Sequence, residues 1–248
     1  MQEPLSALEV ALQHPALVLL GEPGSDKSSF TNHLLYLCAG ALLDQKKNLL
    51  PKKWPREQAM PVRFVLRELA VDLTKVGAET WLQLNADARD RKLLDLVFAH
   101  LKTRLEESQA AGFHDELQTH LRSGTCLVVL DGLDEVAVAQ RPLMRAAITA
   151  LRERLGPNRY IVTCRTRSWD DKHPLPAFHT RLKATCSRTA SAWRPALCSA
   201  SSATPGLACV RSQWRGWNCP AVVLLWVMKK TAHRTKSGFR RSRSAVTP

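Results

Sequence analysis

The chain has 248 residues, 45% hydrophobic and 23% charged, which is ordinary for a globular domain with its own core. Its net charge of +14 is uneven: residues 181–248 hold 13 of the 36 Lys and Arg residues and no Asp or Glu, so residues 1–180 are nearly neutral. A neutral body without basic, aromatic-rich patches argues against specific nucleic-acid binding. The longest apolar run, 221–228, is far shorter than the ~20 residues of a membrane span, and no signal peptide is recognisable. We therefore expect a cytoplasmic protein with reduced cysteines and no membrane partner.

Strands and helices alternate along the body of the chain. Continuous apolar runs are typical of parallel strands buried on both faces, and apolar residues three to four positions apart indicate helices. These patterns predict strands over 16–20, 61–66, 126–130 and 160–163, and helices over 5–13, 30–43, 79–107, 114–123 and 139–154. Such alternation gives right-handed crossovers and a parallel sheet. The predicted fold class is α/β with three layers.

A phosphate-binding loop is predicted directly after the first strand. The sequence GEPGSDKS at 21–28 matches G-x-x-x-x-G-K-[ST] at every fixed position except one. Glycines let backbone N–H groups wrap phosphates, and the following helix directs its positive dipole end at them. Lys27 would contact the β- and γ-phosphates, and the Ser28 hydroxyl would bind Mg²⁺. The predicted nucleotide-binding residues are Gly21, Glu22, Pro23, Gly24, Ser25, Asp26, Lys27, Ser28 and Ser29.

Asp26 is the departure, because the pattern requires glycine there. Its side chain would lie beside the β-phosphate and add like-charge repulsion to a steric conflict. At an effective dielectric near 20, two unit charges about 4 Å apart repel by roughly 4 kcal/mol. We therefore expect weakened nucleotide binding and weak or lost hydrolysis. The structural alternative is an ordinary turn in which Asp26 is a first-turn acid that favours the helix dipole.

An acidic turn follows the third predicted strand. The sequence CLVVLDGLDE at 126–135 carries a carboxylate at the end of a buried strand, as a Walker B motif does. Asp131 would hold Mg²⁺, and either Asp134 or Glu135 could polarise the attacking water. Together with the loop, this turn predicts a P-loop NTPase core.

The pair GEPGSDKS and LVVLDGLDE resembles the NACHT domains of the signal-transduction (STAND) class of P-loop NTPases. PVRFVLREL resembles the second strand of that family, and NRYIVTCRTR resembles its sensor strand. The resemblance assigns the γ-phosphate sensor to Arg165, with Arg167 as the alternative. It covers residues 15–180 and implies a five-stranded parallel core, ATP or GTP with Mg²⁺, slow hydrolysis and nucleotide-gated homo-oligomerisation. Residues 1–14 would form a helical leader, and the chain would be a fragment of a larger switch.

Residues 181–248 differ from the body in composition: they lack acids and hold four of the seven Trp residues. This composition favours a shifted reading frame near residues 180–185, and a disordered native tail is the alternative. Two other functions remain open at this point. One is a non-catalytic remnant or interaction module that no longer binds nucleotide, and the other is salt-dependent nucleic-acid binding by the basic tail.

Overall fold

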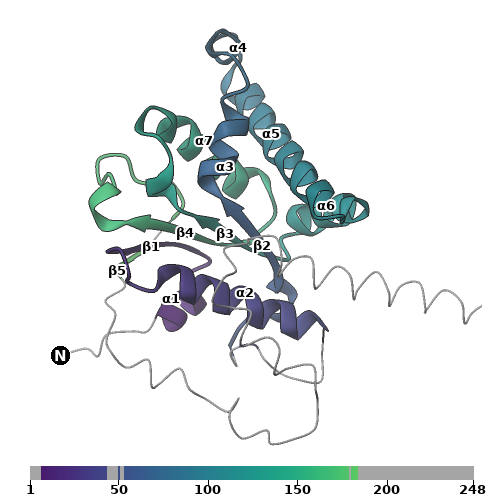
Figure 1. The fold of residues 1–248 in the computed structure, drawn as a ribbon, viewed down its shortest axis with the longest axis vertical. Coiled ribbons are helices and arrows are strands. Elements are labelled where there is room, and N and C mark those ends of the chain that lie inside the picture. Colours follow the sequence, from purple (N-terminus) through teal and green to yellow (C-terminus); the bar gives the residue numbers. More distant parts are fainter. Residues whose placement is uncertain (1–6, 44–49, 51–52, 179, 184–248) are drawn as a thin grey trace, which may run out of the picture.

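Five parallel strands form one sheet at the centre of the molecule (Figure 1). The computed structural model describes residues 7–43, 50, 53–178 and 180–183. The sheet has the order β2-β3-β4-β1-β5, and all of its strand pairs are parallel. The strands are β1 (Ala16–Gly21), β2 (Met60–Val65), β3 (Cys126–Asp131), β4 (Arg159–Arg165) and β5 (Thr180–Lys183). The predicted α/β class with a parallel sheet is confirmed.

Helices cover both faces of the sheet and complete the predicted three layers (Figure 1). One face carries α1 (Ala7–Gln13) and α2 (Lys27–Leu43). The other carries α3 (Leu66–Leu73), α5 (Ala86–Glu107), α6 (His114–Ser123) and α7 (Arg141–Arg154). The short α4 (Ala78–Gln83) projects away from the sheet at the start of α5.

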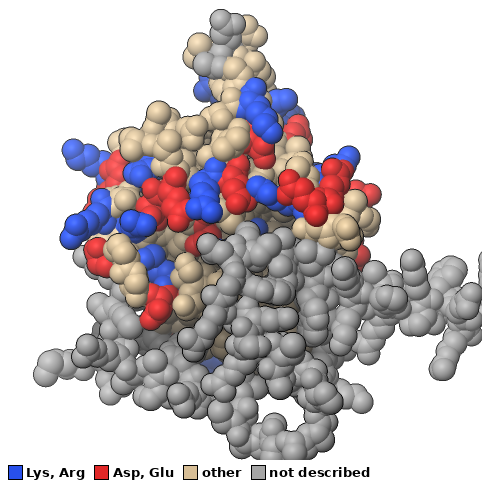
Figure 2. All heavy atoms as spheres, viewed as in Figure 1, with Lys and Arg blue, Asp and Glu red and all other residues tan. Residues whose placement is uncertain are grey.

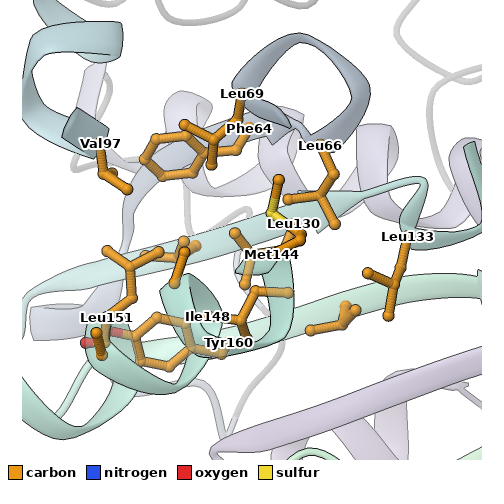
Figure 3. Packing of buried hydrophobic residues seen from close by; sticks show 14 of the residues in the cluster. Phe64, Leu66, Leu69, Val97, Leu130, Leu133, Met144, Ile148, Leu151 and Tyr160 are labelled. Atoms are coloured by element: carbon orange, nitrogen blue, oxygen red, sulfur yellow. The ribbon is translucent and has the colours of Figure 1, made fainter. Parts of the chain in front are cut away.

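Alternate residues of each strand enter two separate hydrophobic clusters, because successive side chains point to opposite faces of a sheet. Val18 and Leu20 belong to the cluster under α3, α5, α6 and α7, whereas Leu17 and Leu19 belong to the cluster under α1 and α2. Figure 3 shows the first cluster, in which residues of the sheet such as Leu130 pack against helix residues. Burial on both faces explains why these strands read as continuous apolar runs.

Two predictions about local structure were wrong. The helix predicted over 79–107 is two helices, α4 and α5. Leu84 between them is extended, and Asn85 caps α5 by accepting a hydrogen bond from the Ala88 N–H at 2.8 Å. The strand predicted over 61–66 ends at Val65, and the unpredicted helix α3 begins at the next residue, Leu66.

Segments beyond both predicted boundaries of the domain, residues 15 and 180, also join the folded unit. The first is α1, whose residues Val10 and Ala11 are buried in the α2-side cluster. The Arg159 guanidinium donates to the carbonyl of Leu12 at 2.9 Å and so ties this helix to β4. At the other end, β5 begins at Thr180 and runs three residues past the boundary expected at residue 180. The proposed frameshifted or disordered tail lies otherwise outside the described residues.

Opposite charges are interleaved across the middle of the face seen in Figure 2. Arg104 pairs with Glu68 at 2.7 Å, and Arg154 pairs with Asp87 at 2.6 Å. Solvent screens such exposed pairs, so each contributes little to stability. Among the described helices, none is long and apolar enough to cross a membrane.

Candidate functional site

The predicted loop, acids and sensor arginine meet at the carboxyl edge of the sheet. β1 ends at Gly21, β3 at Asp131 and β4 at Arg165. β4 lies between β1 and β3, and Gly21 is in register with Arg165. The strand order therefore gathers groups that are distant in sequence.

The loop between β1 and α2 contains two residues with left-handed backbone conformation. Gly24 has φ +76° and Asp26 has φ +56°, both in the left-handed region that side chains disfavour. A Cβ added to Gly24 would meet nothing within 4 Å, so conformation rather than space makes glycine suitable there. Asp26 thus occupies a conformation typical of glycine. Its carbonyl accepts the Phe30 N–H at 2.9 Å and so belongs to the first turn of α2.

Lys27, the first residue of α2, folds its side chain back over the loop. Its ammonium group donates to the Gly21 carbonyl at 2.8 Å, the Glu22 carbonyl at 3.1 Å and the Ser25 hydroxyl at 3.0 Å. These three acceptors use all three ammonium donors. All three acceptors are neutral, and a phosphate oxygen would make a stronger, charge-assisted bond.

The carboxylate of Asp131 is engaged on both oxygens. Oδ1 accepts from the Thr163 hydroxyl at 2.6 Å, and Oδ2 contacts Nη2 of Arg63 on β2. The same Thr163 oxygen accepts the Gly132 N–H at 2.8 Å and so fixes the turn after β3. The side chains of Arg63 and Asp131 are only 17% and 12% exposed, so water screens this ion pair little.

The other two acids of the turn take different partners. Asp134 accepts the backbone N–H of Arg165 at 3.0 Å, and its other oxygen lies 2.8 Å from Nε of the same arginine. Glu135 pairs with Arg67 of α3 at 3.1 Å on the exposed surface. The geometry therefore distinguishes the two candidates for the water-polarising acid, because only Asp134 contacts the predicted sensor.

Both candidate sensor arginines lie at this edge. Arg165 ends β4 beside Gly21 and is half-exposed, whereas Arg167 is almost fully exposed and reaches Glu22 of the loop at 3.7 Å. Arg165 has the firmer position, because a backbone and a side-chain contact to Asp134 hold it.

The phosphate side of the site fits an anion better than its metal side fits a cation. The first-turn N–H groups of α2, Lys27 and the glycine-like turn suit a phosphate. Asp26 opposes the anion, although its exposure lowers the repulsion towards ~1 kcal/mol at 4 Å. On the metal side, a guanidinium already contacts Asp131. Within the described ranges, no group of three His, Cys, Asp or Glu residues could hold a metal ion.

Burial disfavours the charged thiolate form of three cysteines in or near the sheet. Burial raises the pKa of Cys164, next to Arg165, to about 11, and the nearby Asp134 carboxylate adds to this shift. Burial likewise raises the pKa of Cys38 and of Cys126 to about 12. All three are free cysteines.

Two residues of the site were not predicted, namely Arg63 and Thr163. Each is a polar residue inside an apolar strand sequence, PVRFV and YIVTC. A buried charge needs a partner, and this was the available signal. That Asp131 is the partner of both residues could not be predicted from the sequence, because it depends on which strands are neighbours in the sheet.

The fold and this edge define a three-layer parallel α/β domain with a loop-to-helix turn beside an acidic strand end. Comparison with family models, curated proteins and solved structures finds no match to the chain.

Proposed function

We propose that the chain is a nucleotide-binding domain of the NACHT type that takes ATP or GTP at the loop of residues 21–29, with weak or lost hydrolysis. The observation that carries this proposal is the pair of left-handed residues, Gly24 and Asp26, directly before Lys27 at the start of α2. A left-handed turn that leads into a helix presents successive N–H groups to an anion.

The remaining groups of the edge take roles that follow from their positions. Lys27 would exchange its neutral acceptors for β- and γ-phosphate oxygens, and Ser28 would face the metal ion of a Mg²⁺–nucleotide. Arg165 would monitor the γ-phosphate, and Asp134 would be the favoured acid for the attacking water. As they lie, Arg165 and Asp134 neutralise each other, which supports slow hydrolysis. Asp131 could join the metal ion only by opening its pair with Arg63 or by binding the ion while that pair neutralises its charge.

The resemblance to NACHT domains also suggests a cellular role. A nucleotide-gated homo-oligomer in cytoplasmic signal transduction is the role proposed for a larger protein that carries this domain.

One specific observation favours a second function, a non-catalytic module that no longer binds nucleotide. The Lys27 ammonium is fully satisfied by groups of the loop itself, and Asp26 adds an acid where the phosphate would lie. In this alternative the loop is a purely structural turn.

Titration of the intact Asp26→Gly protein with a fluorescent ATP analogue distinguishes the two functions. We expect saturable binding that ATP and ADP displace better than AMP does, because the loop contacts the outer phosphates. Lys27→Ala in the same background should weaken binding at least tenfold. Lys75→Ala, which removes an exposed lysine of the turn after α3, is the matched control and should leave nucleotide binding unchanged. Absence of binding by the Asp26→Gly protein would favour the structural module.

A further inference from the structure

We propose that Arg63 is a built-in cation at the acidic strand end: it holds the place at Asp131 that a divalent metal ion would take, so that nucleotide binding depends little on Mg²⁺. This inference rests on the proposed function and concerns the regulation of the same site. Asp131, the expected metal ligand, is already paired with the guanidinium of Arg63.

Strand register places Arg63 on the face of the sheet that carries α2. On β2, Val62 and Phe64 enter the cluster under α3 and α5, so Arg63 between them points to the α2 face. Its register partner Val129 belongs to the α2-side cluster, and Asp131 lies two residues further along the same face of β3. Arg63 therefore reaches Asp131 diagonally, on the face that carries the helix after the loop.

The surroundings of the pair make it persistent. Both side chains are mostly buried, and Thr163 holds the second carboxylate oxygen at 2.6 Å. Arginine stays protonated at any ordinary pH, so the cation cannot be switched off by deprotonation. The buried Arg63 Nε makes no hydrogen bond within the described residues, and the ion pair of this guanidinium is with Asp131. Separating such a pair would leave uncompensated buried charge.

A metal ion that binds Asp131 must therefore displace a tethered cation or accept a carboxylate that is already neutralised. The nearby pair of Arg67 and Glu135 is different, because both side chains are well exposed and solvent weakens their attraction. Arg67 thus offers a matched control: a second arginine that pairs with an acid of the same turn without contacting Asp131.

The first measurement compares nucleotide affinity with excess Mg²⁺ and with EDTA in the intact Asp26→Gly protein, using the fluorescent ATP analogue. We expect less than a threefold difference between the two conditions. In Arg63→Gln, Mg²⁺ should tighten binding at least tenfold relative to EDTA, whereas Arg63→Lys, which retains the charge, and Arg67→Gln should behave like the parent. A tenfold or larger effect of Mg²⁺ with Arg63 intact would overturn the inference, even if Arg63→Gln failed to fold.

The second measurement does not require nucleotide and so separates this inference from the proposed function. Electron paramagnetic resonance of added Mn²⁺ reports the bound fraction of the ion directly. We expect Arg63→Gln to bind Mn²⁺ at least fivefold more tightly than the parent and Arg67→Gln to match the parent. Equal Mn²⁺ binding by parent and Arg63→Gln would refute the role of Arg63 whether or not nucleotide binds.

Discussion

In the interior of the sheet, β1, β3 and β4 carry apolar side chains that are buried on both faces, and alternation sorts them into two clusters. At the carboxyl edge, β1 leads into a loop with two left-handed residues, and β3 and β4 end in charged residues. Asp131 at the end of β3 pairs with Arg63 of β2, and Arg165 at the end of β4 pairs with Asp134. The interior residues are explained by folding alone. The edge residues hold strain and partly buried charge, which folding alone does not require.

The largest expected effect lies in the interior. Leu130→Ala removes a fully buried side chain from β3 and should lower the free energy of unfolding by about 2–5 kcal/mol, since a cavity remains. Urea denaturation measures this loss. Val138→Ala, at a residue 74% exposed, is the control and should cost less than about 0.5 kcal/mol. Similar losses at both positions would mean that the interior is not packed as described.

A smaller loss of stability is expected at Asp72, whose carboxylate contacts the buried side chain of His100. Burial by itself raises the pKa of Asp72, but hydrogen bonds from Lys75 and His100 outweigh it and hold this pKa below its ordinary value. A lowered carboxyl pKa stabilises the fold above the pKa of the unfolded chain, and this stability is lost as the pH falls through the folded-state pKa.

Asp72→Asn should therefore cost about 1–3 kcal/mol near neutral pH, as for a hydrogen bond to a charged group. The difference between parent and variant should shrink as the pH falls below about 4, the ordinary range for an unfolded Asp. Denaturation curves from pH 7 to pH 3 test this trend. A difference that is constant over this range would show that the contact is not electrostatic.

The smallest expected effect on stability is at Asp26 in the loop. Unlike the substitutions above, replacement of Asp26 by glycine should not destabilise the protein. Asp26→Gly should leave stability unchanged or raise it by up to about 1 kcal/mol, since glycine adopts φ +56° without strain. Asp26→Ala should be less stable than the parent, because alanine keeps the Cβ and loses the local polar contacts that help Asp tolerate this region. Thermal melts that place Ala above Gly would contradict the backbone argument.

The sequence predicted those parts of the fold that local pattern determines. The central strands were placed to within two residues because they are uninterrupted apolar runs. Helix α3 was missed because Leu66 follows Val65 with no turn residue between strand and helix. The break between α4 and α5 has no Gly or Pro, and the Asn85 cap was its one signal. The resemblance implied five strands, but the position of β5 was not predicted because TRLK is not an apolar run.

The sequence predicted which residues of the candidate site follow or end a strand. Lys27, Asp131 and Arg165 lie at one edge, as strand ends of a parallel sheet must. Their ion pairs could not be predicted, because contacts such as Arg63 with Asp131 depend on strand order, which local pattern does not encode.

The central claim is that the loop is a phosphate cradle weakened by Asp26, and the most direct test is the ATP affinity of three intact proteins measured by calorimetry. Asp26→Gly should bind at least ten times more tightly than the parent, a difference that requires only about 1.4 kcal/mol. Asp26→Asn should fall between them, because it removes the charge and keeps the Cβ. The expected order of affinity is therefore Gly, Asn, Asp. Equal and tight ATP binding by all three would contradict the account and would mean that the Asp26 side chain lies away from the bound phosphates.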